Sequence, residues 1–134
     1  MTNYPTPFVN RLQAQLGQQF NDFIQALDTV PPVSVRVNPF KPTSQFEPEE
    51  KVPWCNSAYY LKERPVFTLD PLLHAGAYYV QEASSMFLEE VWKQCITQKD
   101  FVRVLDMCAA PGGKSTHLLS LVGAKGLLVS NELI

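Results

Sequence analysis

Residues 106–116, DMCAAPGGKST, combine small residues, two adjacent glycines and a lysine in one short stretch of the chain. Two kinds of chemistry use such a loop. Glycines followed by Lys114 and Ser115 are typical of a loop that cradles the phosphates of a nucleotide. A glycine turn between a strand and a helix also lets the backbone closely approach a ligand that contains adenosine. The spacing of the residues distinguishes these alternatives.

The phosphate-loop pattern fails at its first position. It requires a glycine separated by four residues from the glycine that precedes the lysine, and Cys108 stands there. Pro111 also lacks the backbone N–H that such a loop must supply. The dinucleotide pattern G-x-G-x-x-G fails as well, because Gly112 and Gly113 are the only glycines of the turn. The sequence therefore matches neither of these nucleotide-binding loops.

Charged residues around the loop fit a ligand with an adenosine end and an amino-acid end, such as S-adenosylmethionine. Glu132 follows the next apolar segment, about twenty residues beyond the glycines, where an acid can accept hydrogen bonds from both ribose hydroxyls. Asp106 can orient the loop or meet the charged amino-acid end of the ligand. Lys114 can pair with the ligand's carboxylate or with RNA phosphates. The simpler alternative is a tight turn without a ligand.

The elements that must position this loop are short and regular. FVRVLDM predicts a strand over 102–107, KSTHLLSLV a helix over 114–122 that ends at Gly123, and GLLVSNE a strand over 126–131. Strand, glycine turn, helix and strand open a doubly wound α/β domain with parallel strands. A further helix is predicted ahead of them, over 82–95. Its expected apolar face consists of Ala83, Met86, Phe87, Val91 and Cys95.

Every proline except Pro111 lies at or before Pro71, so the elements of the first part of the chain must be short. Apolar residues recur at helical spacing across 6–28 with Gly17 as a break, which predicts two short helices. In PPVSVRVNP three valines alternate with polar residues, which predicts a half-buried strand. KPTSQFEPEEK is predicted to be a polar loop. WCNSAYYL and PVFTL are predicted to be short strands or extended segments.

The composition limits the classes of protein to which this chain can belong. The chain has 134 residues, 46% of them hydrophobic and 18% charged, which predicts a folded core. The net charge of -2 gives no support to nucleic-acid binding through bulk electrostatics. We find no apolar run long enough for a membrane span and no secretory signal. Three widely spaced cysteines argue against a disulfide framework and a zinc site, and favour a reducing, cytoplasmic compartment.

Several single residues have more than one interpretation. Arg36 alternates away from the valines and can face an RNA phosphate, a core carboxylate or solvent. Tyr78 and Tyr79 can stack on a base, although aromatic residues ahead of a helix more often belong to a core. His74 and His117 are expected to be structural.

The stretch VLDMCAAPGGKSTHLL resembles the adenosylmethionine-binding motif of the RNA (cytosine-5)-methyltransferases of the Nol/Nop/Sun type. PPVSVRVNP resembles the arginine-asparagine-proline segment of that family's N-terminal region, and AGAYYVQEASSMF resembles the segment ahead of its cofactor domain. NELI resembles the ribose-binding strand end of the bacterial members that methylate small-subunit ribosomal RNA. The resemblance covers nearly the whole chain.

The resemblance implies an α/β fold in two parts. A small α+β region over 1–75, which faces RNA in the family, precedes the first βαβ unit of a Rossmann-like methyltransferase domain over 76–134. It also implies that the parent protein transfers a methyl group from S-adenosylmethionine to carbon 5 of a cytosine in small-subunit ribosomal RNA. The cofactor-binding residues that it carries over are Cys108, Ala109, Ala110, Pro111, Gly112, Gly113, Lys114 and Glu132.

The resemblance further implies how the cytosine is activated, and which residues this chain lacks. In the family a cysteine thiolate adds to carbon 6, and the reactive cysteines stand in Pro-Cys and Thr-Cys pairs. This chain contains neither pair. We expect Cys108 to be a loop residue and Cys55 and Cys95 to be small buried side chains, so we name no catalytic residue and expect a fragment that is inactive alone. The alternative is a non-catalytic module that binds an adenosine ligand or RNA.

Overall fold

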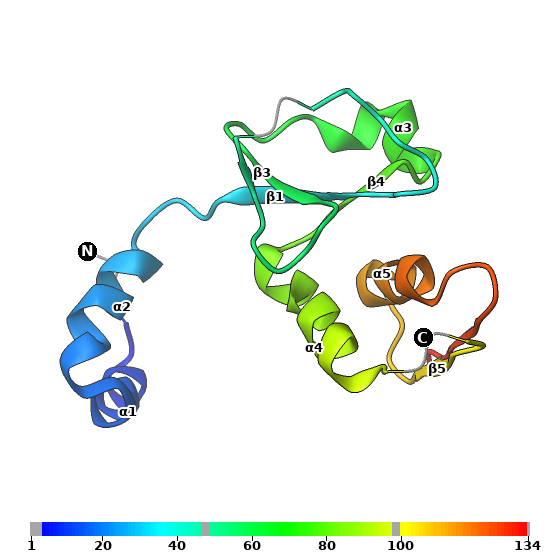
Figure 1. Cartoon of the computed structure of the whole chain (residues 1–134). Helices are drawn as coiled ribbons and strands as arrows, with labels where there is room; N and C mark the ends of the chain where they lie inside the picture. Colours follow the sequence, from blue (N-terminus) through cyan, green and yellow to red (C-terminus); the bar gives the residue numbers. More distant parts are fainter. Residues whose placement is uncertain (1–3, 47–48, 98–99, 134) are drawn as a thin grey trace. The chain divides into compact units, whose positions relative to one another are not determined.

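The computed structural model describes residues 4–46, 49–97 and 100–133 of the chain. The chain packs as two compact units, Met1–Pro31 and Pro32–Ile134 (Figure 1). Within the described residues, no helix is long and apolar enough to cross a membrane.

The first unit is a pair of helices. Helix α1 spans Thr6–Leu16, a 3-10 turn η1 spans Gly17–Gln19, and helix α2 spans Phe20–Leu27. Gly17 ends α1 with a φ of 53°, a conformation that glycine adopts without steric cost. The two predicted helices and the break between them are therefore confirmed.

The second unit begins with a four-stranded antiparallel sheet. Strands β1 (Val33–Val37), β2 (Glu50–Lys51), β3 (Ala58–Leu61) and β4 (Tyr78–Val80) lie in the order β2-β3-β1-β4. Strand β1 pairs with β3 on one side and with β4 on the other. Strand β3 confirms the prediction for WCNSAYYL. Strand β2 closes the predicted polar loop, of which residues 47–48 lie outside the described residues.

Strand β1 forms as predicted, but it is not half-buried. Its valine face packs on a core that contains Val35, Leu61, Phe67, Ala77 and Tyr78. The opposite face is buried too, with Ser34 at 4% exposure and Arg36 at 3%. The prediction was wrong because segments distant in the sequence cover this second face, and a period of two cannot reveal such cover.

The connection between β3 and β4 is helical. A 3-10 turn η2 spans Phe67–Leu69 and a short helix α3 spans Pro71–His74. The Asp70 side chain accepts a hydrogen bond from the backbone N–H of Leu72 at 2.8 Å and so caps α3. The prediction of an extended PVFTL was therefore wrong. Proline at the first helical position and an aspartate N-cap favour a helix start immediately after this segment.

The predicted helix 82–95 begins with a 3-10 segment, η3 (Ala83–Phe87), and continues as α4 (Leu88–Cys95). Ala83 and Met86 are buried as expected and pack with Cys55. The remaining members of the predicted face, Phe87, Val91 and Cys95, are exposed. The change from 3-10 to α-helical geometry rotates the later residues, and Glu89 becomes the buried residue of α4.

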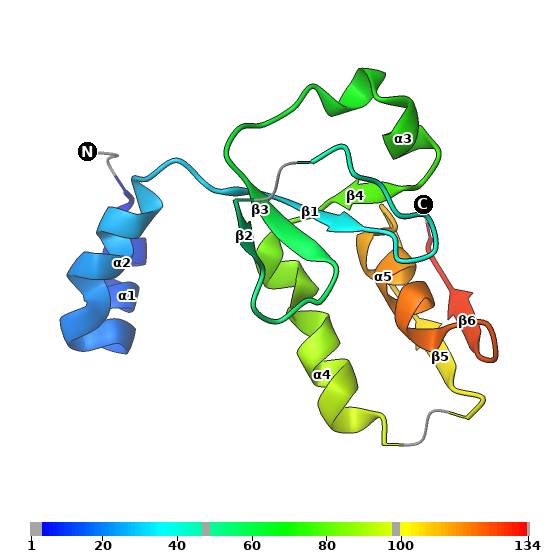
Figure 2. The ribbon, with the colours of Figure 1, turned by 45° about the horizontal axis from the view of Figure 1, so that its top comes forward.

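The predicted cofactor-domain elements form one βαβ unit. Strand β5 (Arg103–Asp106) and strand β6 (Leu127–Ser130) are parallel, and helix α5 (Gly113–Val122) connects them. Figure 2 shows α5 packed along one side of this two-stranded sheet. Gly123 ends α5 with a φ of 68°, as predicted. Leu105, Leu127 and Val129 are exposed on these strands.

Candidate functional site

The loop between β5 and α5 is held by the aspartate that ends β5. One carboxylate oxygen of Asp106 accepts a hydrogen bond from the backbone N–H of Cys108 at 3.2 Å. The other accepts the hydroxyl hydrogen of Ser115 at 2.6 Å, and Ser130 of β6 donates in turn to Ser115 at 3.2 Å. Asp106 therefore connects the beginning of the loop to its end. This agrees with the first of its two predicted roles, which was to orient the loop.

The segment after β6 lies against the same loop. The Glu132 carboxylate accepts a hydrogen bond from the backbone N–H of Ala110 at 3.0 Å. Asn131 accepts from the N–H of Ala109 at 3.0 Å and donates its own N–H to the carbonyl of Asp106 at 2.8 Å. The structure thus brings the predicted ribose-binding acid and the predicted loop into direct contact. The role of Glu132 toward a ribose stays a prediction.

The glycines of the loop serve different purposes. Gly112 has a φ of 99°, which only glycine adopts without strain, and it precedes the first turn of α5. Gly113 has no such φ but is approached closely. A methyl group on Gly113 would lie 3.3 Å from a ring carbon of Tyr79 and 3.5 Å from the side-chain nitrogen of Gln81. Cys108 and Lys114 are exposed beside these glycines.

Three residues outside the predicted loop lie beside it, and two of them donate hydrogen bonds to the loop or to the start of α5. Tyr79 donates its hydroxyl hydrogen to the carbonyl of Pro111 at 3.0 Å. Arg36 donates to the side-chain oxygen of Gln81 at 2.9 Å, and to the hydroxyl of Thr116 in the first turn of α5 at 2.7 Å. Arg36 is 3% exposed, so the interpretation as an exposed strand arginine is wrong, whereas the buried Glu89 favours its charged form, as the interpretation with a core carboxylate expects. Its proximity to RNA stays untested.

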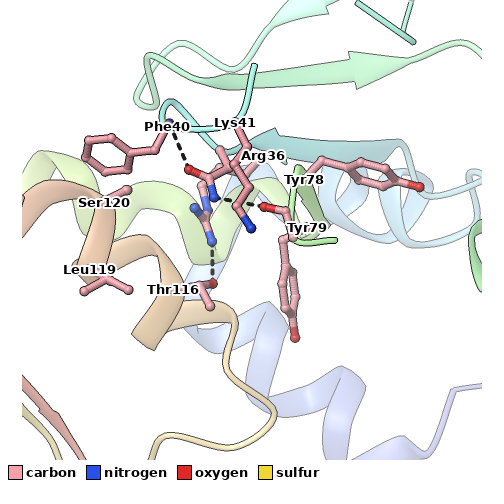
Figure 3. A pocket seen from close by; sticks show the side chains of 10 residues that line it. Arg36, Phe40, Lys41, Tyr78, Tyr79, Thr116, Leu119 and Ser120 are labelled. Carbon is pink, nitrogen blue, oxygen red and sulfur yellow. Dashed lines mark hydrogen bonds between the residues drawn. The ribbon is translucent and has the colours of Figure 1, made fainter. Parts of the chain in front are cut away.

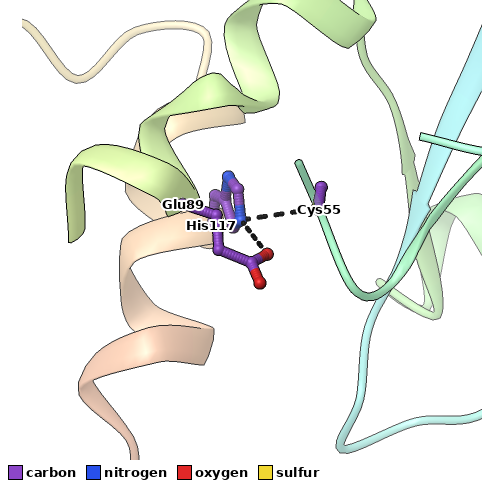
Figure 4. A group of neighbouring side chains, drawn as sticks. All are labelled: Cys55, Glu89 and His117. Atoms are coloured by element: carbon purple, nitrogen blue, oxygen red, sulfur yellow. Dashed lines mark hydrogen bonds and ion pairs between the residues drawn. The ribbon is translucent and has the colours of Figure 1, made fainter. Parts of the chain in front are cut away.

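A second group of side chains lies in the core between the sheet and the helices (Figure 4). His117 of α5 has 1% of its surface exposed, Cys55 has 1% and Glu89 has 3%. The Nε2 atom of His117 lies 3.7 Å from the sulfur of Cys55 and 3.4 Å from a carboxylate oxygen of Glu89. These residue types can bind a metal ion, and their ligand atoms lie within 4.8 Å of one another. Sequence reasoning missed this group because its members come from three distant segments.

The electrostatics of this group favour a hydrogen-bonded core. Burial raises the pKa of Cys55 to about 11, so its thiol is uncharged at neutral pH. Burial and the nearby Arg36 hold the pKa of His117 below its usual value, so the imidazole is neutral. Burial alone would raise the pKa of Glu89, but hydrogen bonds from Cys55, the Asn56 N–H and other groups hold it below its usual value. Glu89 is thus the charged member of the group; its carboxylate lies 3.3 Å from the ammonium nitrogen of Lys93 and also favours the charged form of Arg36.

Comparisons with known proteins agree with the resemblance seen in the sequence. Residues 4–83 match the family model of the N-terminal domain of 16S rRNA methyltransferase RsmF. Residues 94–133 match the model of 16S rRNA methyltransferase RsmB/F.

Individual relatives and a solved structure match most of the chain. It is 34% identical to ribosomal RNA small subunit methyltransferase F of Shewanella piezotolerans, over 98% of this chain and 31% of that protein. The corresponding protein of Vibrio cholerae is 35% identical over 96% of this chain and 30% of its own length. A crystal structure of a methyltransferase homolog from Pyrococcus horikoshii superposes with a TM-score of 0.73 at 28% identity, covering 96% of this chain and 44% of that one. The chain thus spans about a third of the length of the curated relatives that it matches.

Proposed function

Because this chain belongs to the family of the 16S rRNA methyltransferase RsmF, we propose that the protein of which it forms part transfers a methyl group from S-adenosylmethionine to RNA. The proposed target is carbon 5 of a cytosine in small-subunit ribosomal RNA, in the cytoplasm. The names of the curated relatives support the ribosomal substrate. The resemblance of VLDMCAAPGGKSTHLL to the cytosine-5 enzymes supports carbon 5 as the atom that is methylated.

The observation that carries the proposal is the contact between the glycine loop and the acid after β6. Ala110 donates its N–H to Glu132, and Gly112 opens the turn without a side chain. An acidic group beside a glycine turn, at the carboxyl ends of two parallel strands, is where such folds bind an adenosine ligand. When bound, S-adenosylmethionine supplies an electrophilic methyl group. We propose that Cys108, Ala109, Ala110, Pro111, Gly112, Gly113, Lys114 and Glu132 hold it.

These residues hold and orient the cofactor, and we assign none of them to the chemical step. Cys108 is exposed in the loop and donates its backbone N–H to Asp106, which is a structural role for the main chain. The absence of a Pro-Cys or Thr-Cys pair from these 134 residues leaves the proposed nucleophile to another part of the protein.

We propose further that residues 1–75 face RNA and that residues 76–134 begin the methyltransferase domain. The two family models support a functional division in this part of the chain, since one ends at residue 83 and the other begins at residue 94. Packing follows a different division, because β4 pairs with β1 and so joins 76–134 to the preceding sheet. Residues 32–75 and 76–134 are therefore expected to act as one body.

The Glu132→Ala substitution tests the proposed cofactor site. In a protein of the relatives' full length that contains this chain, we expect S-adenosylmethionine binding to weaken by about 1.5–3 kcal/mol, the scale of hydrogen bonds to a charged group. Isothermal titration calorimetry measures the change. Glu63→Ala, at an exposed glutamate of the β3–β4 connection, is the matched control and should bind as the unaltered protein does.

Two outcomes would contradict the proposal. Unchanged affinity in Glu132→Ala would remove this residue from the site. Binding of S-adenosylmethionine without any transfer of labelled methyl to small-subunit ribosomal RNA would favour the alternative, a non-catalytic module for an adenosine ligand or RNA.

A further inference from the structure

Arg36 is a charged residue in an unusual place. It lies in the middle of the four-stranded sheet with 3% of its surface exposed. Burial lowers its pKa, although Cys55, Tyr79 and Glu89 act in the opposite direction. A buried guanidinium loses its hydration and is stable only where its N–H groups find acceptors. The identity of those acceptors therefore shows what this side chain holds in place.

All three acceptors that Arg36 contacts lie beside or inside the glycine loop. Its Nε donates to the side-chain oxygen of Gln81 at 2.9 Å. One terminal nitrogen donates to the Thr116 hydroxyl at 2.7 Å and to the carbonyl of Gly113 at 3.3 Å. Figure 3 shows the guanidinium reaching from the sheet to Thr116, along the wall of a cavity of about 200 Å³.

Helix electrostatics do not explain this position. The first turn of α5 carries partial positive charge from its N–H groups, so a cation there is unfavourable by itself. Glu89 of α4 favours the charged form of Arg36, whereas the start of the helix that Arg36 contacts does not. The contacts with Gly113 and Thr116 therefore fix the position of the loop and helix start at an electrostatic cost.

Two neighbours lie against the same stretch of loop. Gln81 is fixed to β1, since its carbonyl accepts the Ser34 hydroxyl at 2.6 Å. Tyr79 donates its hydroxyl hydrogen to the carbonyl of Pro111 at 3.0 Å, two residues before Gly113, whose carbonyl accepts from Arg36. We call Arg36, Tyr79 and Gln81 the loop clamp. Gly113 permits this close packing, because a methyl group there would lie 3.3 Å from the Tyr79 ring.

We propose that Arg36 is a positioning residue for the cofactor loop, so that the N-terminal sheet forms part of the cofactor site. The ligand in this proposal rests on the proposed function, whereas the clamp itself does not. The guanidinium fixes the carbonyl of Gly113 and the hydroxyl of Thr116, and thereby sets where the loop backbone faces a ligand. It touches no reacting atom.

The test uses the full-length protein with Arg36→Lys, which keeps the charge but cannot reproduce the fork of donors. Hydrogen–deuterium exchange without ligand should become about tenfold faster at the amides of residues 108–110 and 112–116, the loss expected for one charge-assisted hydrogen bond. The dissociation constant and KM for S-adenosylmethionine should rise by about the same factor. The kcat at saturating cofactor should stay within about twofold, because Arg36 acts through the loop.

A matched control and two milder variants keep the result unambiguous. Arg64→Lys alters an exposed arginine of the same unit and should leave loop exchange and cofactor affinity unchanged. Thr116→Val removes one acceptor of Arg36, and Tyr79→Phe removes the hydroxyl that donates to Pro111. Both should loosen the loop by a smaller factor, and they decide the question if Arg36→Lys fails to fold.

The outcomes separate the two proposals. If the unaltered protein does not bind S-adenosylmethionine, the proposed function fails, while faster loop exchange in Arg36→Lys still supports the clamp. The clamp is overturned if loop exchange is unchanged in these variants. It is also overturned if exchange rises equally in β1 and β3, because the effect is then general destabilisation of the fold.

Discussion

His117 shows how one buried side chain joins three segments of the second unit. It extends from α5 toward Glu89 of α4 and Cys55 of the turn before β3. Its Nδ1 atom is buried and has no hydrogen-bond partner among the described residues. Burial disfavours the charged imidazolium, and protonation would place a second cation near Arg36, so the pKa of His117 lies below its usual value.

The neutrality of His117 predicts a dependence of stability on pH. The unfolded chain binds a proton near the ordinary pKa of 6.5, and the folded chain binds it only at lower pH. The free energy of unfolding should thus fall as the pH drops below 6.5, by at most about 1.4 kcal/mol per pH unit. Glu89 adds its own loss only below its ordinary pKa of 4.5.

Thermal unfolding at several pH values between about 5 and 7.5 measures this dependence. His117→Gln should flatten it, because the titrating group that faces Arg36, Cys55 and Glu89 is gone. His74→Gln, at an exposed histidine, is the matched control and should keep the slope of the unaltered chain. Equal slopes in both variants would show that His117 does not titrate on unfolding.

At the scale of elements, the βαβ unit depends on how closely α5 returns to β6. Gly126 begins the return and lies against both the end of α5 and the start of β5. A methyl group on it would lie 2.7 Å from the carbonyl oxygen of Val102 and would overlap the side chain of Val122. The backbone contact leaves no space, whereas the side-chain contact could be relieved.

Gly126→Ala should therefore destabilise the chain by about 1–3 kcal/mol, the usual cost of overpacking. Chemical denaturation measures the change, with Lys125→Ala at an exposed neighbour as the control. The double variant Gly126→Ala with Val122→Ala should not recover the loss, because the overlap with Val102 is with the backbone. Recovery in the double variant would locate the strain in the side chain of Val122.

At the scale of the whole molecule, the chain joins an antiparallel sheet to the first parallel strand pair of a methyltransferase fold. It spans about a third of its curated relatives and contains neither cysteine pair of the proposed chemistry. The proposed role of its own residues is to bind and orient the cofactor, and in the proposed chemistry a cytosine is not activated without a thiolate. Methyl transfer is therefore expected of the full-length protein and not of this chain, whatever cofactor binding this chain retains.

We expect the 134-residue chain alone to transfer no methyl group to any RNA. Incorporation of labelled methyl into small-subunit ribosomal RNA measures this, with the full-length protein as the active reference. Cys108→Ser in the full-length protein should retain substantial activity, since Cys108 is exposed in the loop and contributes its backbone N–H. Activity of the short chain that Cys108→Ser abolishes would make Cys108 catalytic and refute the assignment.

The sequence by itself determined the local features of this protein. The glycine loop, its helix and its two strands depend on residues close together in the chain, where propensity and periodicity act directly. The same holds for the two helices on either side of Gly17. The position of Glu132 was also predictable, because the carboxyl ends of adjacent parallel strands meet at one edge of the sheet.

Only the tertiary structure decided what lies against the loop. Arg36 meets Gln81 and Thr116 across 45 and 80 residues of sequence, and His117 meets Cys55 across 62. Such contacts depend on how the sheet and helices pack, and a residue's type does not reveal its distant neighbours. Burial of a charge is decided at that level too, because Arg36 and Glu89 are stable inside only where hydrogen-bond partners and opposite charge are assembled around them.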